Sequence, residues 1–524
     1  MEALTIRLGQ DILWYIFVLN ANMEHESEDT LPAITTLLRS SQVCSTWRNF
    51  INACPSLWAR VVNFDWLQNE DWRNEVIRRT GRSDLFIRGG GKPRLKGIED
   101  AIILIVVQNW PRMRSLDLDF EQADPKSFLI HDSDVWRTLR RPSKILESFQ
   151  WTLLANNDRN SLAGGVIFSP PEFSIFDNSA PSLRVFIAPN INFSLQASWI
   201  SQLRRLALNA PIHIGTLLEV LNDLPLLESF EDQDSCMIAH PHSNQLRSAS
   251  PVVLPHLKEI IIYTTLDIEP SMGLLAKIRP LHGCLLSFYN NPGRSECDPS
   301  TRAITAASEV LSSYSGHAEL AEAGEVTLSL LEREFVFAVS LPGTDMAFDF
   351  AINCCDHLPD FAVKNLFTAL KFPDFHHIRV LKLRLRTRQG ILHSNPKITE
   401  FCASVSSVET LDTTTKTLQF LLRLPGEALK SAFPVLRKVV LHYPELHHVP
   451  TIQTFLAFRT ASGTPVSTLS IYVIREADLT SLDEFTGLIV AILKYDTVKK
   501  EHFKVKEYIC GSGRPTQFLI TEPE

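Results

Sequence analysis

Apolar residues near the N-terminus recur with the 3.6-residue period of a helix. The residues on one face of the first predicted helix are Leu8, Ile12, Leu13, Ile16 and Phe17. Trp14 and Tyr15 widen the apolar surface beyond the stripe of an ordinary amphipathic helix. This helix therefore has more apolar surface than one neighbouring helix can cover.

A second stretch of helical spacing begins at Leu31 and Pro32, after the acidic, polar connection 20–30. Its apolar members are Leu37, Leu38, Val43, Cys44, Trp47, Phe50 and Ile51. Pro55 should end this helix because proline has no amide donor and clashes with the preceding turn. The pattern predicts a compact set of about three helices. Their surplus apolar surface indicates either a protein partner or packing against the rest of the chain.

Beyond residue 97 the sequence repeats a unit in which an apolar helix and a proline or polar break precede an alternating apolar strand. The copies include PRMRSLDLDF from Pro111, PSLRVFIAP from Pro181, SQLRRLALNAP from Ser201, LPLLESFE from Leu224, LPHLKEIIIY from Leu254, HIRVLKLRL from His377, VSSVETLD from Val405 and FPVLRKVVLHY from Phe433. Alternation places one row of side chains inward, where the preceding helix can cover them.

Self-similarity at irregular intervals of about 20 to 35 residues resembles degenerate leucine-rich repeats. This resemblance implies a solenoid of strand-helix units, in which each unit buries its face against its neighbours. Ordinary βα units of another α/β fold remain the alternative. The predicted fold class is α/β, with a small N-terminal helical domain followed by an irregular leucine-rich-repeat-like solenoid.

Two segments interrupt or close the repeat. EFVFAVSL and DMAFDFAI alternate on either side of Pro342–Asp345, which predicts a β-hairpin insertion at 330–353. Near the C-terminus, SLDEFTGLIVAILKYD predicts a capping helix that begins at Ser481 or Asp483.

The N-terminal segment also resembles a known family through a motif. LGQDILWYIF supplies the pattern of Leu8, Ile12, Leu13, Ile16 and Phe17; SQVCSTWR supplies Val43, Cys44, Trp47 and Arg48; and PSLW supplies Pro55, Leu57 and Trp58. These residues resemble an F-box of the type common in mushroom-forming fungi. Gly9 stands where the family usually has proline, and the connection 20–30 is longer than the family's minimum.

This resemblance implies a substrate receptor of a Skp-cullin-F-box ubiquitin ligase. The family's helices insert into a Skp-type adaptor and reach a cullin scaffold through it. The expected adaptor-binding residues are Leu8, Ile12, Leu13, Ile16, Phe17, Val43, Cys44 and Trp47. The alternative is a repeat-based interaction protein whose degenerate F-box does not engage the adaptor.

Composition indicates a folded protein and argues against nucleic-acid and membrane binding. The 524 residues are 45% hydrophobic and 21% charged, as in ordinary globular proteins. A net charge of −8 argues against nucleic-acid binding, which normally needs a basic surface. The most apolar run, Ala101–Val107, is far shorter than the ~20 residues that span a bilayer. We therefore expect neither a nucleic acid nor a membrane as partner.

Candidate chemistry is sparse. Nine cysteines without a C-x-x-C pair indicate reduced thiols and a cytoplasmic or nuclear location. Cys354, Cys355 and His357 lack the spacing of a zinc site. The glycines 89–91 are followed by Lys92 and Pro93, which does not match a phosphate-binding loop. We expect no metal, no cofactor and no catalytic residue, and hence a receptor rather than an enzyme.

These observations divide the chain into three parts. The predicted domains are an F-box helical domain at 1–62, a linker helix and first strand at 63–97, and a repeat region at 98–524 that binds a protein substrate. The exposed positions that would choose this substrate follow no readable code.

Overall fold

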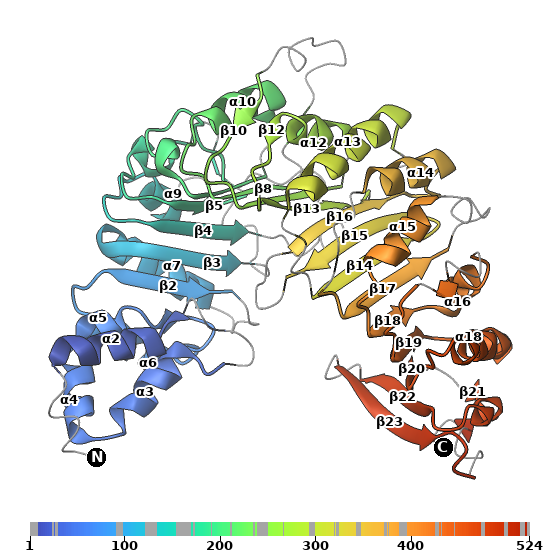
Figure 1. The fold of residues 1–524 in the computed structure, drawn as a ribbon. Coiled ribbons are helices and arrows are strands. Elements are labelled where there is room, and N and C mark those ends of the chain that lie inside the picture. The colour runs from blue at the N-terminus through green and yellow to red at the C-terminus, as the bar shows by residue number, and fades with distance from the viewer. Residues whose placement is uncertain are drawn as a thin grey trace. The chain divides into compact units, whose positions relative to one another are not determined.

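A computed structural model shows a mixed α/β protein with mostly parallel sheet, which confirms the predicted class at that level (Figure 1). The described residues are 9–23, 26, 30–90, 98–120, 134–153, 169–170, 173–189, 191–209, 212–233, 236–237, 250–265, 267–292, 299–318, 320, 324–341, 347–370, 375, 377–386, 396–424, 429–430, 432–444, 446–472, 477–496, 501–513 and 519–520. The chain divides into two compact units, Met1–Leu257 and Lys258–Glu524.

The first unit begins with helices and continues with strands. Its helices are α2 (Gln10–Asn20), α3 (Ala33–Ser41), α4 (Ser45–Asn52), α5 (Pro55–Trp58), α6 (Glu70–Arg79), α7 (Ile98–Asn109), α9 (Asp134–Leu139) and α10 (Ile214–Asn222), with 3₁₀ helices η2 (Trp110–Arg112), η3 (Ile175–Asn178) and η4 (Ile200–Gln202). Its strands are β1 (Val62–Asn63), β2 (Leu85–Gly89), β3 (Met113–Phe120), β4 (Ser148–Leu153), β5 (Val185–Ile187), β6 (Arg205–Leu208), β7 (Ile212–His213), β8 (Ser229–Gln233), β9 (Cys236–Met237) and β10 (Val252–Val253).

Strands β1, β2, β3, β4, β5, β6 and β8 form one parallel sheet in which each strand pairs with the next. One row of cross-strand partners is fully buried: Ile87, Leu116, Phe149, Phe186, Leu206 and Phe230. Phe149 stacks on Phe186 with ring centroids 5.8 Å apart. This apolar row is the core between the strands and the helices and 3₁₀ turns that cover them.

The second unit combines helices with a larger sheet. Its helices are α12 (Glu269–Leu275), α13 (Thr301–His317), α14 (Asp360–Ala369), α15 (Pro396–Ser404), α16 (Thr415–Leu421) and α18 (Val449–Ala461), with η6 (Leu446–His448) and η7 (Thr480–Glu484). Its strands are β11 (Glu259–Thr264), β12 (Ile278–Arg279), β13 (Leu285–Asn290), β14 (Glu325–Leu330), β15 (Glu334–Ser340), β16 (Ala347–Asn353), β17 (Val380–Leu385), β18 (Thr410–Thr413), β19 (Lys438–His442), β20 (Thr468–Tyr472), β21 (Ala477–Asp478), β22 (Ile489–Asp496), β23 (Glu501–Ile509) and β24 (Leu519–Ile520).

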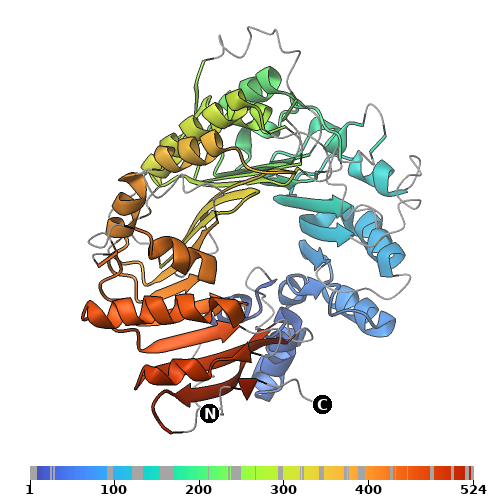
Figure 2. The ribbon, with the colours of Figure 1, turned by 90° about the vertical axis from the view of Figure 1, so that its right-hand side faces the viewer.

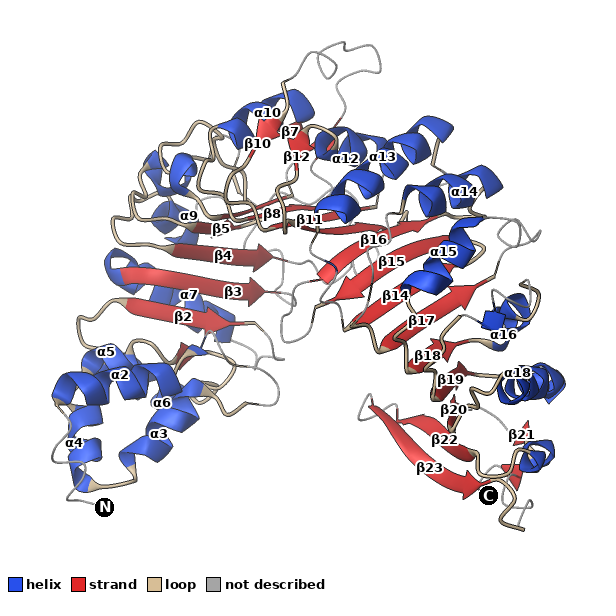
Figure 3. Ribbon diagram, in the orientation of Figure 1, coloured by secondary structure: helices blue, strands red, loops and turns tan. Residues whose placement is uncertain are grey.

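The large sheet of the second unit is parallel except around two strands. Its order is β11, β13, β16, β15, β14, β17, β18, β19, β20, β22 and β23. Strand β15 is antiparallel to both of its neighbours, and β23 is antiparallel to β22. The expected strand pair is present as β15 and β16; the predicted turn at 342–345 lies outside the described residues. Helices α13, α14, α15, α16 and α18 cover one face of this sheet (Figures 2 and 3).

The same turn precedes many of the parallel strands. A buried leucine two residues before the strand donates its amide to the carbonyl three residues earlier, as in Leu203 to Ile200 and Leu436 to Phe433. The next residue donates to the carbonyl of the residue that precedes the neighbouring strand: Arg204 to Arg184, Glu228 to Arg204 and Arg437 to Glu409. Every segment quoted above as a strand-containing copy does contain a strand. The sequence pattern thus corresponds to a repeated backbone geometry.

The capping helix predicted near the C-terminus is wrong. Residues Thr480–Glu484 form only the short 3₁₀ helix η7, and Ile489–Asp496 form strand β22. Gly487, at φ +87°, lies between them in a backbone conformation that a continuing helix does not use. The apolar run that follows it is a buried strand rather than a helix face.

The described residues among the first sixty form helices, although not with the predicted boundaries. The second stretch is divided into α3 and α4 by the turn at Gln42–Cys44. Helix α4 ends at Asn52, and Pro55 then occupies the first turn of α5, where a missing amide costs nothing.

Candidate functional site

Helix α2 carries apolar side chains on opposite faces. Leu13 and Phe17, four residues apart, are only 3% and 1% exposed. Ile12, Tyr15 and Leu19 follow the i, i+3, i+7 spacing of a single face and are 51%, 61% and 73% exposed. We call Ile12, Tyr15 and Leu19 the exposed row of α2. Large apolar side chains in such a row are typical of a surface that a partner covers.

The buried face of α2 packs against α4 through aromatic rings. The ring of Phe17 lies edge-on to Trp47, with centroids 5.0 Å apart and planes at 79°. The Phe17 and Phe50 centroids are 6.0 Å apart. The buried Nε1 of Trp47 has no hydrogen-bond partner among the described residues. Phe17 and Trp47 therefore hold the helices together, and Trp47 contributes through its ring rather than through its polar atom.

The adjacent residues Val43 and Cys44 have different roles. The sulfur of Cys44 accepts a hydrogen bond from the amide of Trp47 at 3.4 Å, so Cys44 caps the N-terminus of α4. The side chain of Val43 is 56% exposed in the turn just before this cap. Val43 is therefore available to a partner, whereas Cys44 acts on the helix.

The structure thus separates the predicted adaptor-binding residues into groups. Leu13 and Phe17 belong to the core, Ile12 and Val43 are exposed, and Ile16, Cys44 and Trp47 are partly exposed. Leu8 lies outside the described residues. The predicted set omitted Tyr15 and Leu19, although their spacing from Ile12 was a readable signal.

Trp14 connects α2 to the start of the sheet. Its Nε1 donates to the Ser56 hydroxyl at 3.1 Å, and the Arg60 guanidinium lies 5.7 Å from its ring centroid. The same guanidinium lies 4.5 Å from the ring centroid of Phe86 on β2. Stacking of one cation on two aromatic rings fixes the orientation of the N-terminal helices against the first strands.

Glu26 and Arg88 reinforce this connection. The Glu26 carboxylate accepts hydrogen bonds from the Asn63 side chain at 2.6 Å and from the Ala33 amide at 2.5 Å. The Arg88 guanidinium on β2 donates to the Met23 carbonyl. The segment after α2 is therefore bonded both to α3 and to the sheet.

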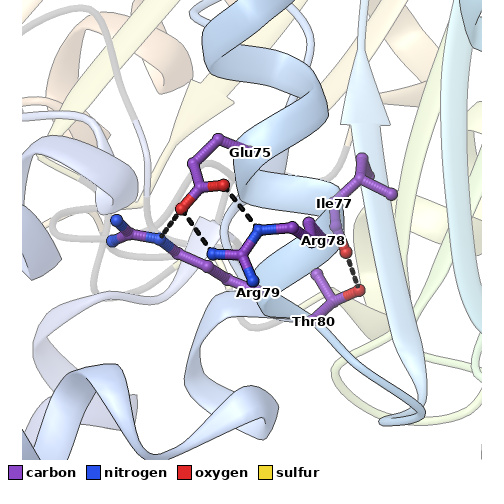
Figure 4. A network of polar contacts seen from close by, with 5 residues as sticks. All are labelled: Glu75, Ile77, Arg78, Arg79 and Thr80. Atoms are coloured by element: carbon purple, nitrogen blue, oxygen red, sulfur yellow. Dashed lines mark hydrogen bonds and ion pairs between the residues drawn. The ribbon is translucent and has the colours of Figure 1, made fainter.

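Helix α6 adds a charged network next to this connection (Figure 4). Glu75 accepts hydrogen bonds from Arg78 at 2.7 and 2.8 Å and from Arg79 at 2.8 Å. These bonds lower the pKa of Glu75 to about 2. The Arg79 guanidinium also lies 4.5 Å from the ring centroid of Trp58 on α5. The network links α6 to the N-terminal helices.

Two polar and aromatic clusters lie on the sheet of the second unit. Tyr263 on β11 stacks on its register partner Tyr289 on β13, with ring centroids 5.2 Å apart. The Tyr289 hydroxyl donates to Asp349 Oδ2 at 2.6 Å. Burial raises the pKa of Tyr289, and the hydrogen bond and negative charge of Asp349 raise it further. Burial also raises the pKa of Asp349. No pattern in the sequence indicated that these distant strands would become neighbours.

The second cluster spans β18, β19 and β20. Nε2 of His442 lies 2.8 Å from Asp412 Oδ1, and its ring stacks on Tyr472 with centroids 4.6 Å apart. Burial, together with the Asp412 carboxylate, raises the pKa of Tyr472. The charged and aromatic groups of both clusters can contact a polar partner surface.

Other candidates have structural explanations. In the described part of the chain, no group of three or more His, Cys, Asp and Glu side chains could hold a metal ion. Gly90 has φ +151°, and a Cβ there would lie 2.3 Å from the Asp119 Cβ. Its amide donates to Asp65 Oδ1 at 2.8 Å. This glycine is required by a close approach of two backbone segments; Gly91 lies outside the described residues.

Over the described residues, each helix is too short or too polar to cross a bilayer.

Comparisons with known proteins add little. No protein-family model matches the chain, and no curated protein matches it. Among solved structures, the chain is similar to a structural-genomics crystal structure of a protein from Bacteroides fragilis. That similarity has 8% identity and a TM-score of 0.21, and it covers 72% of this chain and 74% of the other. A TM-score this low carries no argument. The fold alone defines the class, an α/β protein with mostly parallel sheets and an exposed apolar row on its first described helix.

Proposed function

We propose that this protein is the substrate-recognition subunit of a Skp-cullin-F-box type ubiquitin ligase. The N-terminal helices bind a Skp-type adaptor, and through it a cullin scaffold. The remaining chain holds a protein substrate. With reduced cysteines, the proposed location is the cytoplasm, the nucleus or both.

The exposed row of α2 is the observation that carries this proposal. Ile12, Tyr15 and Leu19 present apolar surface from a helix whose other face already forms the core. Hydrophobic residues on one face would suffice for a helix that only packs on its own chain. The second face falls within the segment that resembles an F-box, and Val43, from the same motif, is exposed as well.

The repeated backbone geometry supports the solenoid part of the proposal. In the first unit each strand of the main sheet lies parallel to the next one in the chain, and the same turn introduces many strands. Stacked strand units with a shared turn are typical of leucine-rich-repeat-like solenoids. The sheet face opposite the helices of the second unit then offers Tyr263, Asp349, His442 and Tyr472 as contact residues for a substrate.

The proposed role involves no covalent chemistry by this chain. A receptor that holds a substrate close to a charged conjugating enzyme raises the effective concentration of the acceptor lysine. The rate of ubiquitin transfer would then depend on geometry and residence time at both binding surfaces.

An alternative function is a binding protein that no longer engages the adaptor. Gly9 precedes α2 without any side-chain cap, in the position where the F-box family usually has proline. This feature weakens the start of α2 and favours the alternative. In this case the exposed row would have no adaptor to cover it.

Co-purification of the full chain with the Skp-type adaptor of its own organism distinguishes these functions. A variant that carries Ile12→Asp and Tyr15→Asp should lose the adaptor, because two charges enter an apolar interface. A matched control is Leu104→Asp on α7, since Leu104 is 55% exposed on a helix outside the motif. The control should bind like the unmodified chain.

Surface variants are preferable to a chain that starts at Asn63. Asn63 lies in β1, pairs with β2 and donates to Glu26. Truncation there would break the sheet edge together with any binding surface. Equal recovery of adaptor by the unmodified chain and the folded double variant would contradict the interface. Absence of any complex with the unmodified chain would favour the alternative function.

A further inference from the structure

A cavity of about 540 Å³ lies where the end of α2 meets the parallel sheet of the first unit. Val18, Ala21 and Met23 form one wall, and side chains of β2 to β6 form the floor. This volume lies within the range of small-molecule sites, which is about 300 to 1,000 Å³. The adaptor-binding proposal does not use this cavity.

The floor follows from strand register. One row of cross-strand partners contains Phe86, Ser115, Ser148, Val185 and Arg205, and the next row contains Arg88, Asp117 and Gln150. Side chains two residues apart on a strand point to the same face, so both rows face the cavity and away from the buried row that includes Phe149. The small Ser115 and Ser148 leave the space that the end of α2 does not fill.

The lining is strongly cationic. Arg60, Arg88 and Arg205 line the cavity, against Asp117 as the lining carboxylate. Three of the lining side chains are guanidinium groups and one is a carboxylate, and Asp65 lies near enough to Asp117 to raise its pKa. Arg88 Nε lies 3.5 Å from Asp117 Oδ2, and this ion pair neutralises part of the positive charge of the lining. Burial raises the pKa of Asp117, while Arg88 and Arg205 oppose that rise.

Neutral hydrogen-bonding groups lie among these charges. Gln150 Nε2 is 3.5 Å from the Ser148 hydroxyl, and the Ser115 hydroxyl lies in the same row as Ser148. Hydroxyl and amide donors beside guanidinium groups are the usual contacts of phosphate oxygens in proteins.

We propose that this cavity is a binding site for a small phosphate-bearing molecule. The ligand bridges the N-terminal helices, through Arg60, and the sheet, through Arg88 and Arg205. Its binding stabilises the orientation of α2 against β2 to β6.

Pyrophosphate is the probe, measured by equilibrium dialysis of the labelled anion against the full chain at constant ionic strength. Constant ionic strength is needed because surface charges alone bind anions in a salt-dependent way. We expect saturable binding at one site. Arg205→Gln should weaken it roughly tenfold or more, since a charge-assisted contact is lost.

Arg204→Gln is the matched control. Arg204 neighbours Arg205 in sequence, but it pairs with Glu228 at 2.7 Å and does not line the cavity. It should bind pyrophosphate like the unmodified chain. A second variant, Ser115→Val, should reduce binding by filling the floor without a change of charge. Far-UV circular dichroism and thermal unfolding of each variant establish that it is folded.

Three results would overturn the proposal. They are no saturable binding by the unmodified chain, equal weakening by Arg204→Gln and Arg205→Gln, and equally tight binding of citrate, which would show recognition of charge alone. None of these measurements requires the adaptor, so the outcome is independent of the proposed ligase function.

Discussion

At the scale of residues, α2 separates side chains that hold the fold from side chains that face solvent. Phe17 is enclosed by Trp47 and Phe50, while Leu19, two residues later, is 73% exposed. Both are large apolar residues on one helix. Their effects on stability should therefore differ because of their positions rather than their chemistry.

Replacement of these two residues tests that difference. Phe17→Ala should reduce the free energy of unfolding by about 3 to 5 kcal/mol, because it removes a buried ring and leaves a cavity. Leu19→Ala should change it by no more than about 0.5 kcal/mol. Urea denaturation of both variants gives the comparison. Similar losses for the two variants would contradict the assignment of Leu19 to the surface.

The candidate site could be predicted in part at this scale. The spacing of Leu13 and Phe17 placed them on a common face, and both are buried. The sequence could not show that Ile12 and Val43 would be exposed, because exposure depends on which face of α2 meets α4. The cavity arginines could not be grouped either, since Arg60, Arg88 and Arg205 are far apart in the chain and meet only through the sheet register.

At the scale of elements, the beginning of α2 is only weakly determined. Gly9 is the N-cap, with φ −59° and ψ 151°, and its helix has no side-chain cap. This φ is within the range that a proline ring imposes, and no atom lies within 4 Å of a Cβ built at Gly9.

Gly9→Pro should therefore stabilise the protein by about 0.4 to 1 kcal/mol, chiefly because the unfolded chain loses conformational freedom. If the adaptor binds α2, the variant should also bind it at least as tightly as the unmodified chain. Thermal unfolding and adaptor co-purification measure the two effects. Gly463→Pro is a suitable control. Gly463 has φ +75°, which a proline ring cannot adopt, so this variant should be less stable than the unmodified chain. A loss of stability in Gly9→Pro would contradict the N-cap geometry.

The network on α6 should respond to acid. The pKa of Glu75 is lowered to about 2 from 4.5 by its bonds to Arg78 and Arg79. Its stabilising contribution is present above pH 4.5 and is lost as the pH falls toward about 2. The melting temperature of Glu75→Gln should lie slightly below that of the unmodified chain at neutral pH, and this gap should close in acid. The gap is small because the Glu75 side chain is partly exposed to solvent, which screens its ion pairs. A gap that does not vary with pH would contradict the network.

Element types were predictable where the local pattern was unambiguous. The strands after Leu203 and Leu436 have a short apolar pattern and come directly after a tight turn. The sequence therefore indicated both the strand and its start. The segment that becomes β22 has the apolar run IVAIL, which fits either a buried strand or a helix. The glycine before it, Gly487, was the signal that favoured a strand.

At the scale of the molecule, the structure predicts that unfolding is not a single step. The two units are each compact, with separate apolar rows such as Leu116–Phe149–Phe186 in the first and Phe288–Phe350–Phe337 in the second. All nine tryptophans lie between residues 14 and 199, within the first unit. Tryptophan fluorescence therefore reports on the first unit alone, while far-UV circular dichroism reports on both.

Because each compact unit has its own apolar core, we expect the two signals to give different urea midpoints. Phe337→Ala, in the core of the second unit, should shift the circular dichroism transition and leave the tryptophan transition nearly unchanged. Phe149→Ala, a matched substitution in the first unit, should shift the tryptophan transition instead. Coincident transitions that both variants move equally would show that the chain unfolds as one cooperative body. In that case a ligand in the cavity of the first unit would stabilise the whole molecule rather than one part of it.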